Sequence, residues 1–128
     1  LPDVSQSLII TRMEGRTKVP PLESIERFAA HQASMAIYLS TGMLEKLSGR
    51  LIAGGYQKDT PAALVYKATW PEEEAYICTI GELPEVAKAH GITKTALIIV
   101  GDVVTHHAYE RSKLYDPEFT TEFRQGVK

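Results

Sequence analysis

One short run constrains the fold more than any other feature of this sequence. Residues 96–100 read Ala-Leu-Ile-Ile-Val and are apolar at every position. A strand with one face in water alternates apolar and polar side chains, whereas a strand covered on both faces is apolar throughout. The run therefore predicts a central strand of a sheet that is covered on both faces.

Four other runs are also rich in β-branched and aliphatic residues, and we interpret them as strands. They are Ser7 to Thr11, Met35 to Leu39, Ala63 to Tyr66 and Tyr76 to Ile80. The stretch between the third and fourth strands, 67–75, is long enough for a hairpin with a functional loop. The other connections allow helical crossovers between strands.

Three segments between the strands have helical spacing and helix end signals. The first has Leu22, Ile25, Phe28 and Ala29 on one face after Pro20-Pro21; the second has Leu44, Leu47 and Leu51, with Thr41 as cap and Gly54-Gly55 as stop; the third runs from Pro84 to His90. The predicted order is strand, helix, strand, helix, strand, strand, helix, strand. The fold class is therefore α/β, with a mixed sheet of about five strands flanked by helices.

Composition excludes several classes of function. The chain has 128 residues, enough for one domain, and its 14 basic and 16 acidic residues leave a net charge of -2 without a dense basic face. We therefore expect no nucleic-acid partner. A single cysteine, and no apolar run near the roughly 20 residues that a spanning helix needs, predict a cytoplasmic protein without a membrane partner. The chain opens Leu1-Pro2-Asp3-Val4 without a Met, so we expect a piece of a longer protein.

The residues that could carry familiar catalysis are few. His106-His107 lacks a third ligand at metal spacing, so we favour a surface or capping role over metal binding. Cys78 lies among apolar residues, and we interpret it as a small buried thiol. Glu72-Glu73-Glu74 could raise one another's pKa, but in a loop we favour a solvated face. We predict no catalytic acid, base or nucleophile and no protein-bound metal.

Two loops that follow strands are better candidates for a binding site. The segment 11–17 offers Arg12 and Arg16 beside a flexible Gly15, at the end of a strand where α/β proteins often bind ligands. Arginine suits the capture of carboxylates, although ordinary surface ion pairs would use the same residues. The segment 67–71 sets small side chains beside Trp70, which could line a pocket or fill the core.

Four segments together resemble the precorrin-4 and cobalt-precorrin-4 carbon-11 methyltransferases of the tetrapyrrole methylase family. They read Ser-Leu-Ile-Ile-Thr-Arg with Glu-Gly-Arg-Thr (7–17), Ser-Met-Ala-Ile-Tyr-Leu (34–39), Tyr-Lys-Ala-Thr-Trp-Pro (66–71) and Lys-Thr-Ala-Leu-Ile-Ile-Val-Gly (94–101). The order and spacing of the segments match across nearly the whole chain. The last segment is shared by tetrapyrrole methylases in general, whereas 14–17 and 67–71 point to the carbon-11 enzymes.

The resemblance implies a two-domain enzyme that holds S-adenosylmethionine between its halves and methylates a tetrapyrrole rich in carboxylates. It implies that residues 1–128 are the carboxyl-terminal half, without the amino-terminal Gly-Pro-Gly loop and Gly-Asp-Pro segment, and inactive alone. It also implies a homodimer. The donor, released as S-adenosylhomocysteine, would contact Tyr38, Leu39, Ala68, Thr69, Thr95 and Ala96; the substrate would contact Arg12, Glu14, Arg16, Lys67 and Trp70.

Two other functions remain open. One is another tetrapyrrole methylase acting at a different ring position, or the related diphthine synthase. The other is a module that binds a ligand or partner without catalysis. The methyl-donor assignment requires that Leu39, Ala68 and Thr95 converge on one crevice, and this expectation can be tested directly in a structure.

Overall fold

The computed structural model describes residues 3–39 and 41–105 of the chain. Its strands are β1 (Leu8–Arg12), β2 (Ser34–Leu39), β3 (Pro61–Tyr66), β4 (Glu74–Thr79) and β5 (Ala96–Val100). Its helices are α1 (Ile25–Ala29), α2 (Leu44–Gly54) and α3 (Leu83–Ala89), with short 3-10 turns η1 (Pro21–Glu23), η2 (Thr41–Met43), η3 (Ile80–Glu82) and η4 (Asp102–Val104). The predicted order of strands and helices is confirmed.

The five strands form one mixed sheet in the order β1-β2-β5-β3-β4. The β1 and β2 strands are parallel, and the other neighbouring pairs are antiparallel. The β5 strand is therefore central, as its apolar run predicts, and β3 and β4 form the expected hairpin. Crossovers through α1, α2 and α3 make the remaining connections.

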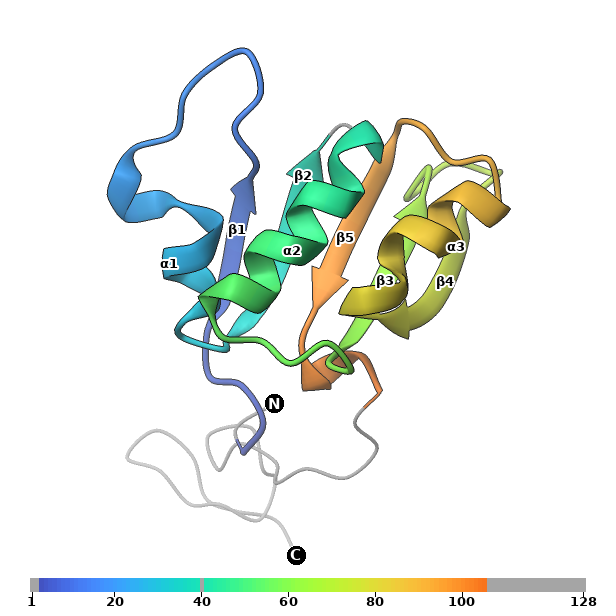
Figure 1. The fold of residues 1–128 in the computed structure, drawn as a ribbon. Helices are drawn as coiled ribbons and strands as arrows, with labels where there is room; N and C mark the ends of the chain where they lie inside the picture. The colour runs from blue at the N-terminus through green and yellow to red at the C-terminus, as the bar shows by residue number, and fades with distance from the viewer. Residues whose placement is uncertain (1–2, 40, 106–128) are drawn as a thin grey trace, which may run out of the picture.

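All three helices pack on one face of the sheet, as Figure 1 shows. The core lies between this helical layer and the sheet, where Leu47 and Leu51 of α2 are fully buried together with Ile37, Leu64 and Ile98 from the strands. Burying a side chain of this size stabilises the fold by about 1.5–3 kcal/mol before the entropy of ordering it is subtracted.

The first predicted helix is split in two by Ser24. Its backbone is extended (φ -66°, ψ 155°), and its hydroxyl accepts a hydrogen bond from the Arg27 N–H at 3.3 Å. Serine in this position caps a helix, so α1 begins at Ile25 and the preceding residues form only η1. Leu22, which the spacing placed on the apolar face, is 71% exposed as a result.

The prediction that β5 is covered on both faces is wrong for the part of the chain that the structure describes. Alternate side chains of β5 are buried under the helices, but Leu97 and Ile99 point the other way and are only partly buried. We call the opposite surface the open face; its apolar members are Leu8, Ile10, Ala36, Tyr38, Ala63, Val65, Ala75, Ile77, Leu97 and Ile99. Residues apolar on both faces of a strand thus do not establish that both faces are packed.

Candidate functional site

The ends of three strands meet at one edge of the sheet, the upper edge in Figure 1. Because β5 runs antiparallel to both neighbours, its first residue, Ala96, pairs with Leu39 at the end of β2 and with Tyr66 at the end of β3. The turn after β3 is joined to the same point, since the Lys67 N–H donates to the Thr95 carbonyl at 2.8 Å. The three segments therefore meet at one edge of the sheet, as expected.

A cavity of about 310 Å³ lies at this junction. It is lined by Tyr38, Ala68, Thr95, Ala96 and Leu97. Four of these five belong to the six residues that the resemblance assigns to the methyl donor. Thr69 does not line the cavity, and Leu97 was not expected. Leu97 could have been found from strand periodicity, because its side chain leaves the same face of the sheet as Tyr38, its partner in register.

The turn at residues 67–70 is held by its own hydrogen bonds. The Trp70 N–H donates to the Lys67 carbonyl at 2.9 Å, and the Thr69 N–H donates to a carboxylate oxygen of Glu73 at 2.9 Å. Glu73 is exposed, as expected for the acidic run, but it also orders this turn. The small Ala68 side chain is thereby fixed in the wall of the cavity.

Backbone strain is concentrated around the same cavity. Lys67, Thr69 and Thr95 have φ values of 49°, 72° and 62°. A positive φ is costly for any residue with a side chain and most unusual for β-branched threonine, at about 1–3 kcal/mol each. Such conformations persist only where the surrounding structure enforces them, and they gather at functional sites. Sequence reasoning missed this feature because the positions do not carry the glycines that usually signal it.

Aromatic rings flank the Lys67 ammonium beside the cavity. Its Nζ lies 5.3 Å from the centroids of both the Tyr66 and the Trp70 rings, within the range of a cation–π interaction. Trp70 is 52% exposed, so it does not fill the core and stays available as a flat wall. The structure thus places Lys67 and Trp70 together, next to the residues assigned to the donor.

The loop after β1, residues 13–18, leaves the same edge of the sheet. It starts beside the cavity, because Arg12 pairs in register with Tyr38. The Arg12 guanidinium donates to the carbonyls of Met13, Thr17 and Lys18 at 3.2, 3.3 and 3.4 Å, respectively. Arg12 therefore braces the loop, while Arg16 is exposed on it.

Glu14 is engaged elsewhere. Its carboxylate accepts a hydrogen bond from Arg50 of α2 at 3.2 Å, and Arg50 also makes a two-pronged contact with Glu26 of α1. The structure thus brings Arg12 to the cavity edge but assigns the Glu14 carboxylate to a contact within the fold.

Cys78 is partly buried, less than the sequence interpretation of a buried thiol implies. Burial, and secondarily the charge of Glu82, raises the pKa of the half-buried Cys78 thiol to about 11, so the nucleophilic thiolate is scarce at neutral pH. Within residues 3–39 and 41–105, no three His, Cys, Asp or Glu side chains are grouped closely enough to hold a metal ion. His106-His107 lies outside the described residues. No described helix has the length and apolarity needed to cross a membrane.

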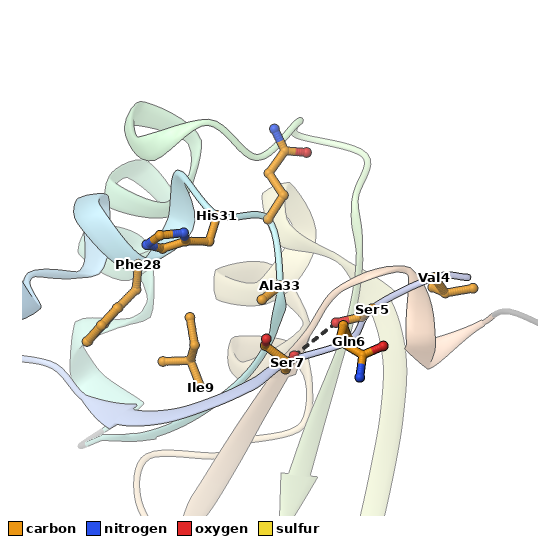
Figure 2. A pocket seen from close by; sticks show the side chains of 9 residues that line it. Val4, Ser5, Gln6, Ser7, Ile9, Phe28, His31 and Ala33 are labelled. Atoms are coloured by element: carbon orange, nitrogen blue, oxygen red, sulfur yellow. Dashed lines mark hydrogen bonds between the residues drawn. The ribbon is translucent and has the colours of Figure 1, made fainter. Parts of the chain in front are cut away.

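A larger cavity of about 550 Å³ lies beside the amino-terminal ends of β1 and β2 (Figure 2). Residues 4–7 form one wall, and Phe28, His31 and Ala33 form the other. The Ser5 hydroxyl in this wall donates to the Ser7 carbonyl at 2.9 Å and accepts from the Ser34 N–H at 2.9 Å. None of the residues singled out in the sequence for donor or substrate lines it.

Relatives of known name match the whole chain. A cobalt-precorrin-4 C(11)-methyltransferase of Methanocaldococcus jannaschii is 48% identical over 128 residues, which are 100% of this chain and 49% of the relative. A precorrin-4 C(11)-methyltransferase of Pseudomonas aeruginosa is 41% identical, over 98% of this chain and 50% of the relative. The chain therefore spans about half the length of the curated relatives it matches.

Solved structures show the same fold. The X-ray structure of a cobalamin biosynthetic enzyme, cobalt precorrin-4 methyltransferase, matches with a TM-score of 0.75 and 40% identity, over 79% of this chain and 42% of that one. A uroporphyrin-III C-methyl transferase from Thermus thermophilus, complexed with S-adenyl homocysteine, matches with a TM-score of 0.59 and 20% identity, over 78% and 43%. The α/β mixed-sheet prediction is confirmed. The profile of one family, described as Tetrapyrrole (Corrin/Porphyrin) Methylases, matches residues 1–84, and with the relatives above it shows that this chain belongs to the tetrapyrrole methylases.

Proposed function

We propose that the complete protein is an S-adenosylmethionine-dependent methyltransferase that acts on precorrin-4 or cobalt-precorrin-4 at carbon 11 in cobalamin biosynthesis. The observation that carries this proposal is the likeness to relatives of those names, at 48% identity over the whole chain and at 41% over 98% of it. The convergence of three family-like segments on one cavity supports it, because the resemblance requires that geometry.

The methyl donor fits the cavity lined by Tyr38, Ala68, Thr95 and Ala96. The side chains of Ala68 and Ala96 are only methyl groups, which leaves room for a flat nucleoside near the backbone. The donor would also approach Leu39, whose backbone pairs with Ala96, and Thr69 in the strained turn. A solved methyltransferase of the same fold was crystallised with S-adenyl homocysteine.

The tetrapyrrole would bind beside the donor, over the loops at the same edge. Its carboxylates would meet the cations Arg12, Arg16 and Lys67, and Trp70 offers an exposed ring to a planar macrocycle. Glu14 contributes indirectly, since its carboxylate is held by Arg50.

Methyl transfer forms a carbon–carbon bond at an electron-rich ring carbon while the carbon–sulfur bond of the donor breaks, which leaves S-adenosylhomocysteine. Such an in-line displacement depends on alignment of the two reactants and on exclusion of water. The residues of this chain would supply alignment: the strained turn fixes Ala68 against one reactant, and the cationic loop fixes the other. No acid or base from this chain takes part in the proposed step.

We further propose that the matched half is the carboxyl-terminal one and that it is inactive alone. The 128 residues contain neither a Gly-Pro-Gly nor a Gly-Asp-Pro tripeptide, which the resemblance places in the amino-terminal half. The other half would close the cavity, which the described residues leave open to one side.

We also propose a cytoplasmic homodimer, in keeping with the resemblance. The open face supports a partner surface, because Leu8, Ile10 and Ile77 on it are 60%, 66% and 61% exposed. Exposed apolar area of this kind commonly marks an association site. The single cysteine suits a reducing compartment.

Reconstitution from two halves tests the function and the placement together. The chain is co-expressed with either the amino-terminal or the carboxyl-terminal half of a cobalt-precorrin-4 methyltransferase relative and is given donor and precorrin-4. We expect transfer to carbon 11, located by NMR, only with the amino-terminal half. A methyl at another ring position would overturn the regiospecificity, and activity only with the other half would overturn the placement.

A cavity-filling variant tests the donor site in the same complex. Ala68→Val adds bulk where the nucleoside would lie, so we expect the affinity for S-adenosylhomocysteine to fall by about tenfold or more, an effect of about 1.4 kcal/mol. Ala75→Val, on the exposed hairpin strand, is the matched control. Equal affinities in a calorimetric titration of the two variants would refute the donor assignment.

A further inference from the structure

Arg50 joins three parts of the fold that are distant in sequence. It lies on α2, and its guanidinium contacts Glu26 of α1 through both Nε and Nη2 and Glu14 of the 13–18 loop through Nη2. The Arg50 side chain is only 17% exposed, so solvent screens these contacts less than it would on an open surface. Fork-shaped contacts between arginine and carboxylate are directional and fix the positions of both partners.

The contact with Glu26 orients Arg50 before it reaches the loop. The Glu26 carboxylate of α1 accepts from Nε and Nη2 of the guanidinium, and the same Nη2 also donates to Glu14. The hydrogen bond from Arg50 lowers the pKa of Glu26 to about 2, so this carboxylate is charged at any ordinary pH. The α1 and α2 helices thus present a fixed cation to the loop.

The loop has two other attachments, both at its ends. Met13 is buried in the core, at 4% exposure, and Arg12 donates to the carbonyls of Met13, Thr17 and Lys18. Among the described residues, the contact of Glu14 with Arg50 is the one charged attachment between this loop and the helical layer. Arg16 lies between the attachments and carries the exposed guanidinium that faces solvent.

From this arrangement we infer that Arg50 is a positioning residue for the substrate site: through Glu14 it fixes the 13–18 loop and so determines where Arg16 presents its charge. The inference rests on the proposed function for the identity of the ligand, a polycarboxylate. The claim that Arg50 fixes the loop does not depend on that function. Arg50 would touch neither donor nor substrate. The consequence of losing it would be a misplaced cation, not a lost chemical group.

Limited proteolysis tests, without any substrate, whether Arg50 fixes the 13–18 loop. Trypsin cleaves after Arg16 and Lys18, and such cleavage requires local opening of the loop. In the complete enzyme, we expect Glu14→Gln and Arg50→Gln to speed cleavage within the loop by about tenfold, the usual scale for a lost charged hydrogen bond. Lys46→Gln, an equal charge change at an exposed position of α2, is the matched control and should leave the rate unchanged.

Steady-state kinetics of the same variants test whether the position of the loop matters for binding of the substrate. We expect Glu14→Gln to raise KM for the tetrapyrrole by about tenfold, with kcat and the affinity for S-adenosylhomocysteine little changed. The Glu14→Gln, Arg50→Gln double variant should have a KM no higher than that of Arg50→Gln, because both substitutions remove the same contact between Arg50 and Glu14. Arg50→Lys should restore part of the loss, since it keeps the charge.

The outcomes separate the two ideas. Unchanged cleavage in both Gln variants would overturn the inference, whatever the kinetics. Faster cleavage with an unchanged KM would show that Arg50 orders the loop without serving the substrate, and would overturn the positioning role. Absence of methyl transfer in the unsubstituted complete enzyme would instead refute the proposed function, and the cleavage rates would still decide the role of Arg50 in the loop.

Discussion

The two faces of the sheet carry similar side chains but differ in what covers them. On the helical face, a row across the five strands reads Thr11, Ile37, Ile98, Leu64 and Tyr76, and its three middle members are fully buried. On the open face, the adjacent row reads Ile10, Ala36, Ile99, Ala63 and Ile77, and its two outer members are 66% and 61% exposed. Apolar composition is therefore common to both faces, and packing distinguishes them.

The difference teaches that stability and association are assigned to opposite sides of the same strands. The helical face carries the hydrophobic core and should carry most of the free energy of unfolding. On the open face, Leu8, Ile10 and Ile77 keep apolar area in water, which contributes little to folding but is available to a partner. Substitutions at adjacent positions of one strand can therefore separate the two roles.

The largest expected effect comes from adjacent isoleucines in β5. Ile98 is fully buried under the helices, so Ile98→Ala should lower the free energy of unfolding by about 2–5 kcal/mol through lost burial and a cavity. Ile99→Ala, on the open face, should cost less than half as much. Urea unfolding of the two variants, followed by circular dichroism, measures both. Equal losses would show that the two faces are packed alike.

A second contrast lies within α2, between two glycines. A Cβ at Gly54 would come within 2.6 Å of the Ala29 Cβ and of the Glu26 carbonyl oxygen, so Gly54→Ala must push α1 and α2 apart. We expect a loss of about 1–3 kcal/mol from overpacking. A Cβ at Gly49 would meet nothing within 4 Å, and Gly49→Ala should raise stability by about 0.5–1 kcal/mol through helix propensity. Thermal unfolding would contradict this account if both substitutions shifted Tm in the same direction.

The sequence predicts the elements of this fold well because strand and helix signals are local. The apolar run at 96–100 correctly predicted that β5 is central in the sheet. The predicted helix stop at Gly54-Gly55 matches the end of α2, where Gly55 has a φ of 135°. The burial of both faces of β5 could not be predicted correctly, because it depends on which layers pack over a strand. The start of the first helix was predicted wrongly because Ser24 caps α1, whereas the apolar spacing alone would continue the helix through it.

The candidate site could be predicted only in part. Tyr38, Ala68, Thr95 and Ala96 were identified through the family resemblance, and the sheet register explains why they meet. The Arg50–Glu14 contact was missed, since a pairing across 36 residues leaves no local pattern. The strained φ values of Thr69 and Thr95 were missed because threonine is not a residue that signals them.

The helical layer should also respond to pH through Glu26. Its pKa is about 2 in the folded chain against an ordinary 4.5, chiefly because Arg50 donates hydrogen bonds to it. A lowered pKa means that this stabilisation is complete above pH 4.5 and is lost as the pH falls toward 2. Because the Glu26 side chain is 37% exposed, we expect the contribution to be only about 1 kcal/mol.

Urea unfolding of Glu26→Gln at several pH values measures this contribution. The variant should be less stable than the unsubstituted chain at pH 7, and the gap should close between pH 4.5 and 2, since the carboxyl is then neutral in both. Glu45→Gln, at an exposed position of α2, is the control and should show no such gap. A gap that persists unchanged at pH 2 would contradict an electrostatic origin.

The smallest effect on stability is expected on the open face. Ile10 is 66% exposed, so Ile10→Ser removes little buried area and should change the free energy of unfolding by no more than about 0.5 kcal/mol. The same change should weaken self-association of the complete protein, because it places a hydroxyl in the proposed partner surface. Urea unfolding and sedimentation equilibrium measure the two effects separately, with Thr11→Ser, the adjacent residue on the helical face, as the control that should leave the association constant unchanged. A loss of 2 kcal/mol or more in unfolding, a scale expected of core substitutions, together with unaltered self-association, would reverse the roles assigned to the two faces of the sheet.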